Sequence, residues 1–159
     1  MSIWWSLHLR REAASVPLAR RLLLGTMEAA GVDPEISHDL SIALTEACAN
    51  AVEHGGAAGA GDDYRVTAFI DGDTCRIEVT DSGPGFPYAP PHLAPRPGFS
   101  SPQPPHQTAP AQAEHGRGLF LIEALTDHVR YRNRVGRAGA VVSFDKILKW
   151  REDALLKAS

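Results

Sequence analysis

The feature that most constrains this chain is the distribution of its prolines. Ten of the twelve lie between Pro84 and Pro110. Proline has no backbone N–H and holds φ near one value, so such a stretch forms neither a helix nor a central strand. Regular structure is therefore expected before and after this stretch, and residues 86–115 are expected to form a long loop.

Residues 15–30 predict the first helix. Ser15 is the candidate N-cap, Pro17 suits the first turn and Gly31 is the expected stop. Its apolar stripe is expected at Leu18, Leu22 and Met27.

A second helix is predicted from about Pro34 to Glu53, with Gly55-Gly56 as its end. Asp33 precedes it, and apolar residues recur at helical spacing along it. These positions are Leu40, Ala43, Leu44, Ala47 and Ala51.

The remaining regular segments predict five strands and a third helix. The third helix is expected to follow a glycine turn at Gly116, and Asp71-Gly72 is a hairpin signal. The order predicts an α+β fold, a two-layer sandwich of mostly antiparallel sheet with helices on one face. It is expected as one domain, residues 1–150, followed by a tail, residues 151–159. The strands are expected at residues 3–9, 64–70, 74–80, 129–133 and 140–148.

Composition excludes several classes of protein. A length of 159 residues suits one domain with a core. The formal charge of −3 argues against direct nucleic-acid binding through a basic surface. No apolar run approaches the roughly 20 residues that span a membrane, and no signal peptide is evident, so a cytoplasmic protein without a membrane partner is expected. Cys48 and Cys75 form neither a disulfide scaffold nor a metal-ligand spacing.

Three polar side chains follow one face of the second helix: Glu46, Asn50 and His54. An amide oxygen is a good ligand for a hard divalent cation, and a carboxylate beside it can orient or deprotonate a hydroxyl. The alternative is a solvated polar stripe, with His54 bonding the last carbonyls of the helix.

The stretch Asp81-Ser-Gly83-Pro-Gly85 directly follows a predicted strand. A carboxylate at a strand end can accept a hydrogen bond from an exocyclic amine, while glycines let a flat ring approach. The alternative is an ordinary turn of Asp, Ser, Gly and Pro.

The stretch Gly116-Arg117-Gly118-Leu119 opens the third predicted helix. A glycine turn at a helix N-terminus exposes N–H groups and the positive end of the helix dipole, which suits an anion. It is neither a Walker A motif nor a dinucleotide-binding fingerprint. The alternative is a helix start that is merely rich in glycine.

Together, in this order, the three motifs resemble those of the GHKL (Bergerat-type) ATP-binding fold. Residues 46–54 resemble its N box, residues 81–85 its first glycine box and residues 116–119 its second. Within that superfamily the small domain resembles the anti-sigma factor serine/threonine-protein kinases of bacterial partner-switching systems. The resemblance extends from the first strand to about residue 148.

The resemblance implies a role for each motif. Asn50 would coordinate Mg²⁺ on the ATP phosphates, Glu46 would act as general base toward a protein serine or position it, and Asp81 would bind the adenine amine. Arg20 on the first helix would contact protein partners. The remaining nucleotide-binding positions would be Gly83, Gly85, Gly116, Arg117, Gly118 and Leu119.

Two departures from the family pattern bear on activity. The segment expected to form the ATP lid, residues 86–115, is mostly Pro and Ala, and its candidate phosphate contacts are few. Ala140 follows Gly139, where the family often has Thr. The candidate lid contacts are Arg96, Ser100, Ser101 and His115.

Two functions from different classes follow. The first is an anti-sigma factor and ATP-dependent kinase that sequesters a sigma factor and phosphorylates a serine of an anti-anti-sigma (STAS-domain) protein. The second is a nucleotide-binding regulatory module that binds partners without phosphoryl transfer. The aromatic start Ile3-Trp4-Trp5 is expected at a sheet edge and to support a homodimer; the alternative is that both tryptophans pack in the core.

Overall fold

The computed structural model describes residues 2–54, 63–83, 110–135 and 139–152, and within these the side chains of 54 and 110–117 are not described. Its three helices and five strands follow the order that the sequence predicts. The elements are β1 (Ser2–Arg10), α1 (Ser15–Ala30), α2 (Pro34–His54), β2 (Asp63–Asp71), β3 (Thr74–Thr80), α3 (Pro110–Leu125), β4 (His128–Asn133) and β5 (Ala140–Ile147).

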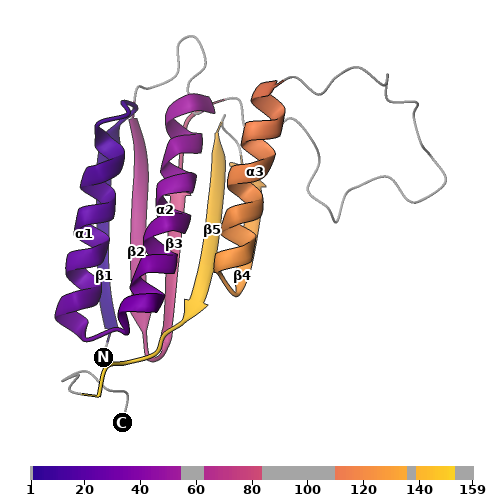
Figure 1. Ribbon diagram of the computed structural model, residues 1–159. Coiled ribbons are helices and arrows are strands. Elements are labelled where there is room, and N and C mark those ends of the chain that lie inside the picture. The colour runs from indigo at the N-terminus through magenta and orange to yellow at the C-terminus, as the bar shows by residue number, and fades with distance from the viewer. Residues whose placement is uncertain (1, 55–62, 84–109, 136–138, 153–159) are drawn as a thin grey trace.

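The five strands form one sheet in the order β1-β2-β3-β5-β4, and each of these neighbouring pairs is antiparallel. All three helices lie on the same face of the sheet, side by side, and leave the other face without a helix (Figure 1). The prediction of a two-layer α+β sandwich is therefore confirmed. No helix in the described ranges is long and apolar enough to cross a membrane.

The hydrophobic core fills the space between the sheet and the helices. From α2 it takes all five positions of the predicted stripe, each of which is buried. Val66, Ile77 and Phe144 face them from the three central strands and are almost fully inaccessible. The Asp33 carboxylate accepts the backbone N–H of Glu35 at 2.9 Å and so caps the start of α2.

Helix α1 occupies its predicted range but turns a different face to the core. Leu18 and Leu22 are 53 % and 40 % exposed, whereas Leu23 is fully buried and packs inward with Met27. The predicted stripe was wrong for both exposed leucines. A run of three leucines fits two registers of the helix, and the sheet selects the one that places Leu23 inside.

Ser15 was also wrong as the N-cap of α1. It is the first residue of the helix, Ala14 precedes it, and no side chain caps this end. The Ser15 hydroxyl instead donates to the Glu12 carbonyl at 2.7 Å and shares a 2.6 Å hydrogen bond with the Tyr64 hydroxyl. The predicted stop at Gly31 is confirmed, since this residue ends α1 with a φ of 86°.

The aromatic start of the chain is divided between the two faces of the sheet. β1 is an edge strand, as predicted. Trp5 points to the helices, where its indole N–H donates to Thr26 Oγ1 at 3.2 Å. Trp4 is 65 % exposed on the open face, beside its cross-strand partner Phe69. The alternative that both tryptophans pack in the core is therefore wrong, since only Trp5 packs against it, and the homodimer stays a prediction.

Helix α3 begins earlier than the sequence indicates. It starts at Pro110, so residues 110–115, expected to belong to the long loop, are its first turns. Gly116 and Gly118 lie inside the helix, and the predicted glycine turn at its N-terminus was wrong. The rest of the proline-rich segment and the predicted end of α2 at Gly55-Gly56 lie outside the described residues.

Candidate functional site

Four segments meet at one end of the sandwich. The C-terminal half of α2, the N-terminal half of α3, the end of β3 and the start of β5 all lie at this end (Figure 1). Residues of all three predicted motifs lie at this end, two motifs on the helices and one directly after β3, so segments far apart in the sequence share one region. The side chains there form two groups, one between the helices and one between the strands.

The first group joins α2 to α3. A Cβ placed on Gly118 would lie 3.1 Å from Glu46 Oε2, and 3.8 and 3.9 Å from the Asn50 side-chain oxygen and nitrogen. The backbone of α3 therefore runs directly over the polar face of α2, as close as a residue without a side chain permits. This arrangement places the second glycine motif against Glu46 and Asn50, although not at a helix N-terminus.

Asn50 carries an amide nitrogen that is buried and has no hydrogen-bond partner among the described residues. A buried amide donor without an acceptor costs about 1–3 kcal/mol, so such a group indicates a site that something else completes. A phosphate or water oxygen would accept from this nitrogen, and the amide oxygen suits Mg²⁺. The residues present therefore fit a Mg²⁺–nucleotide complex.

A metal cage made of protein side chains alone is not found here: among the described residues no three His, Cys, Asp or Glu side chains form a candidate cluster. Mg²⁺ usually keeps waters and takes one or two protein ligands together with substrate phosphates. A single ligand such as Asn50 is consistent with that mode of binding.

The second group holds the Asp81 carboxylate. Its Oδ1 accepts the backbone N–H of Gly83 at 2.9 Å and that of Ala140 at 3.2 Å. The Asp81 N–H in turn donates to the Ala140 carbonyl at 3.0 Å, which extends the β3–β5 pairing by one residue. Two backbone N–H donors therefore hold the Asp81 carboxylate in a fixed orientation.

Two residues of this group were not found from the sequence as site residues. Arg134 donates from Nη1 to the Asp81 carbonyl at 3.4 Å and to Ser82 Oγ at 3.5 Å. Gly139 has a φ of 138°, and a Cβ there would lie 2.2 Å from the Asp81 carbonyl oxygen. For Gly139, the glycine directly before Ala140 could have indicated a close backbone approach. For Arg134, no neighbouring residue in the sequence indicates its contact with Asp81.

The remaining predicted positions divide into described and undescribed ones. Gly83 is buried beside Asp81, and Leu119 is buried in the core, with its carbonyl accepting the Tyr131 hydroxyl at 3.1 Å. Gly116 lies within α3. The positions outside the described residues or side chains are His54, Gly85, Arg96, Ser100, Ser101, His115 and Arg117.

A buried polar cluster lies behind the N box. Burial raises the pKa of the Cys48 thiol to about 12, although a hydrogen bond with Tyr64 opposes the shift. Burial likewise raises the pKa of Tyr64 to about 12. Cys75 is free and buried too, and burial raises its pKa to about 12. All three groups stay protonated near neutral pH, so the thiols are structural and unreactive.

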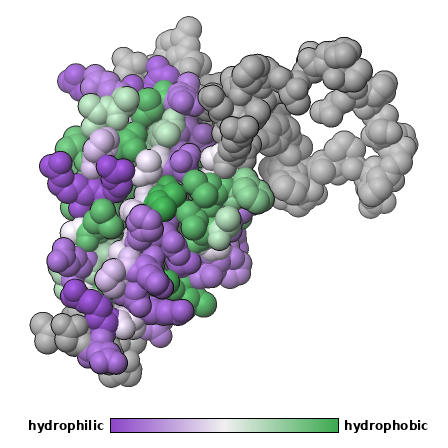
Figure 2. Space-filling model, in the orientation of Figure 1, coloured by the Kyte–Doolittle hydropathy of each residue, from purple (hydrophilic) through white to green (hydrophobic). Residues whose placement is uncertain are grey.

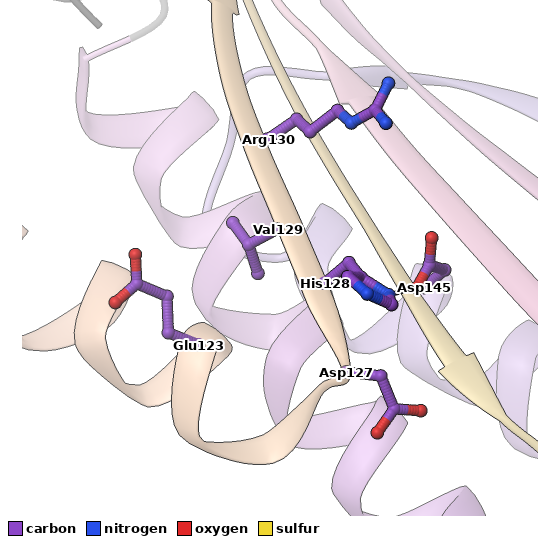
Figure 3. A pocket seen from close by; sticks show the side chains of 6 residues that line it. All are labelled: Glu123, Asp127, His128, Val129, Arg130 and Asp145. Atoms are coloured by element: carbon purple, nitrogen blue, oxygen red, sulfur yellow. Dashed lines mark hydrogen bonds and ion pairs between the residues drawn. The ribbon is translucent and has the colours of Figure 1, made fainter. Parts of the chain in front are cut away.

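A separate hollow of about 540 Å³ opens beside the first residues of β4. Within it the Asp145 carboxylate bonds His128 at 2.9 Å, and Arg76 lies 3.8 Å away. Figure 3 shows Glu123 and Val129 on one side of β4, and His128 and Asp145 on the other. The Asp145 carboxylate is already paired with His128, and none of the predicted motifs lines the hollow. The nucleotide is therefore not assigned to this hollow.

Comparison with known proteins gives consistent results. A family model described as a histidine kinase-like ATPase domain matches residues 9–146. The serine-protein kinase RsbW of Bacillus licheniformis is 32 % identical over 133 residues, covering 84 % of this chain and 78 % of that protein. The serine-protein kinase RsbW of Listeria monocytogenes serotype 4b (strain F2365) is 34 % identical over 127 residues, covering 79 % and 76 %.

Among solved structures, the RsbU and RsbW domains of a Mycobacterium tuberculosis protein resemble this chain with a TM-score of 0.65 at 21 % identity. The match covers 93 % of this chain but 32 % of that one, so this chain spans about a third of the solved chain. At this identity the likeness concerns the fold.

Proposed function

The chain belongs to the histidine kinase-like ATPase domain family, among the GHKL-type anti-sigma factor serine-protein kinases, and from that premise we propose that it phosphorylates a protein serine with ATP. The substrate would be a serine of an anti-anti-sigma (STAS-domain) protein, and its phosphorylation would inactivate that protein and so leave a sigma factor bound to this chain. We place the protein in the cytoplasm, as a single domain.

The observation that carries this proposal is the contact of α3 with the Glu46–Asn50 face of α2. Glu46 Oε2 lies 3.1 Å from the position of a Gly118 Cβ, and the Asn50 amide nitrogen lacks a described partner. A carboxylate and an amide held close together by the packing of two helices suit phosphoryl transfer, which depends on positioning and charge neutralisation.

Each side chain then has a task that its surroundings support. The Asn50 amide would hold Mg²⁺, which supplies neutralisation of phosphate charge when bound. Glu46 would orient the incoming serine hydroxyl and take its proton. Asp81, held by two backbone donors, would accept the exocyclic amine of adenine.

The test is Glu46→Ala, assayed for transfer of labelled phosphate to a candidate anti-anti-sigma protein and for ATP affinity by calorimetry. We expect transfer to fall by at least about a hundredfold, within the range for losing a general base, while ATP binding changes little. Glu35→Ala is the matched control, since Glu35 is an exposed glutamate on the same helix. Unchanged transfer by the Glu46 variant would refute the assigned role.

A nucleotide-binding module without transfer activity is the second candidate. Ala140 motivates it, because the family often has a hydroxyl there. The Ala140 contact with Asp81 is made by the backbone N–H, so the orientation of the Asp81 carboxylate does not depend on that side chain. This candidate predicts ATP binding with no phosphoserine on any partner.

We propose that protein partners contact the helical face. Figure 2 shows hydrophobic patches between hydrophilic residues on this face. Leu18 and Leu22 are exposed on α1 near Arg20, and Phe120 is 70 % exposed on α3. Exposed apolar side chains beside charged ones are typical of interaction sites. Leu22→Asp is expected to weaken partner binding without changing ATP affinity.

We further propose a homodimer through the open face of the sheet at its β1 edge. Trp4 and Phe69 lie opposite each other on β1 and β2, and both are exposed there. Burying this aromatic pair against a second copy would remove a large apolar surface from water. Trp4→Ser should shift the protein to monomer in sedimentation at micromolar concentration; a wild-type monomer at that concentration would contradict the dimer.

A further inference from the structure

Arg134 links the β4–β5 connection to the residues that follow β3. Its backbone N–H donates to the Gly139 carbonyl at 2.9 Å and closes the connection. Its guanidinium reaches the Asp81 carbonyl and the Ser82 hydroxyl at 3.4 and 3.5 Å. One side chain therefore bonds both the backbone carbonyl of Asp81 and the hydroxyl of the next residue.

The stem of Arg134 is held in place by Gly139. A Cβ on Gly139 would lie 2.4 Å from Arg134 Cδ and 3.2 Å from its Cγ. The stem thus occupies the space that any other residue at 139 would fill, and the positive φ of Gly139 is one that side chains rarely adopt. Close packing against Gly139 restricts the rotamers of Arg134, and its guanidinium points to the Asp81 carbonyl.

These contacts act on the carboxylate through its own backbone. The Asp81 N–H and Oδ1 bond the carbonyl and N–H of Ala140, so the orientation of the carboxylate depends on the spacing of the β3 and β5 ends. Arg134 holds the third polar group of Asp81, its carbonyl, from the same connection. The carboxylate is therefore fixed relative to β5 by three different groups.

We propose that Arg134 is a positioning residue for base recognition: it orients the Asp81 carboxylate and so sets the preference for a purine that carries an exocyclic amine. The inference rests on the proposed role of Asp81 as the amine acceptor. It concerns the base alone, because the Glu46–Asn50 group that faces the phosphates makes no contact with Arg134 in the described residues.

The experiment compares the affinities for ATP and for inosine triphosphate by calorimetry with Mg²⁺. Inosine triphosphate has the same sugar and phosphates, with a carbonyl in place of the amine. Arg134→Met keeps the stem and removes the guanidinium. We expect it to lower the ratio of the two affinities about three- to tenfold, the value of one hydrogen bond, by weakening ATP alone.

Two variants serve as controls. Arg134→Lys keeps the stem and a charged donor, and is expected to retain most of the wild-type ratio. Arg132→Met removes the same charge from an exposed residue two positions earlier and should behave as wild type. Urea unfolding of each variant establishes that it is folded at the temperature of the titrations.

The inference is overturned if Arg134→Met keeps the wild-type ratio, or if it weakens both nucleotides equally, since a merely structural residue would do the latter. Failure of the proposed function has a different signature. In that case the wild type itself would not prefer ATP, and Asp81→Asn would bind the two nucleotides as the wild type does.

Discussion

Replacing Gly118 with Ala should have opposite effects on the stability of helix α3 and on the activity of the site. Gly118 lies inside α3, where Gly costs about 0.5–1 kcal/mol relative to Ala. The new methyl would meet Glu46 Oε2 at 3.1 Å, about 0.3 Å closer than the 3.4 Å at which ordinary contacts begin. The atom it meets is the end of a flexible side chain, which can move at little cost. We therefore expect Gly118→Ala to be as stable as the wild type, or up to about 1 kcal/mol more stable.

The same methyl should reduce phosphoryl transfer. A misplacement of about 1 Å at a reacting group can cost a factor of about 100, so a shift of about 0.3 Å in the Glu46 carboxylate corresponds to roughly fourfold. The two Asn50 atoms lie at 3.8 and 3.9 Å, within ordinary contact distance, and need not move. ATP affinity should consequently change less than the rate of transfer.

Urea unfolding and single-turnover transfer from ATP measure these two effects. Gly25→Ala is the matched control, because Gly25 lies in α1 and an added Cβ there would meet nothing within 4 Å. It should gain the same helix stability and keep the wild-type rate. The reasoning is refuted if Gly118→Ala is destabilised by more than about 1 kcal/mol while Gly25→Ala is stabilised, or if both variants transfer phosphate equally well.

The other predictions concern the supports of the site and the core. Gly139→Ala combines a disfavoured φ with a 2.2 Å approach to the Asp81 carbonyl and should cost about 2 kcal/mol or more in urea unfolding. Ser15→Ala removes the 2.6 Å hydrogen bond of the buried Tyr64 hydroxyl, which keeps its bond with Cys48, and should cost about 0.5–1.5 kcal/mol, with exposed Ser2→Ala close to neutral. Both cysteine thiols have folded pKa values of about 12 against 9.0 when exposed, so the unfolded state loses these protons first; the free energy of unfolding should fall as pH rises above 9, and a flat profile between pH 8 and 10.5 would contradict this.

Helix α2 was predictable from sequence because its information is local. Five apolar residues at helical spacing define one face, and Asp33 supplies the cap directly before Pro34. The polar stripe of Glu46 and Asn50 then has a fixed direction relative to the core face. Once α2 was placed, the side of the helix that carries the site followed from its periodicity.

Helices α1 and α3 show where local patterns fail. Leucine occurs on both faces of α1, so its sequence does not distinguish Leu18 and Leu22 from Leu23, and only packing against the sheet does. In α3 the glycines were interpreted as a turn because Gly has low helix propensity. The helix nevertheless includes Gly118, since that position faces the side chains of α2 at close range. Tertiary packing determines both outcomes.

The strand group of the site was half predictable. Asp81 and Gly83 belong to one local turn, in which the Asp81 carboxylate accepts the N–H of the residue two positions later. Asp commonly makes this bond in turns, so the contact can be expected from the local sequence alone. The contacts of Ala140 and Arg134 with Asp81 connect residues more than fifty positions apart. Such contacts depend on the strand order β3-β5-β4, which brings two hairpin ends together and which no single segment encodes.

Gly118 and Gly139 support the two groups of the site in the same way, because each removes a Cβ where backbone must approach an acidic residue. Ala at position 139 should nevertheless lower the free energy of unfolding, whereas Ala at position 118 should leave it unchanged or raise it. The obstacle at Gly118 is a movable carboxylate, whereas the obstacle at Gly139 is the fixed carbonyl of Asp81. If both variants lose nucleotide-dependent activity while one gains stability and the other loses it, activity at this end of the sandwich follows the geometry of the two acidic residues and not the stability of the fold.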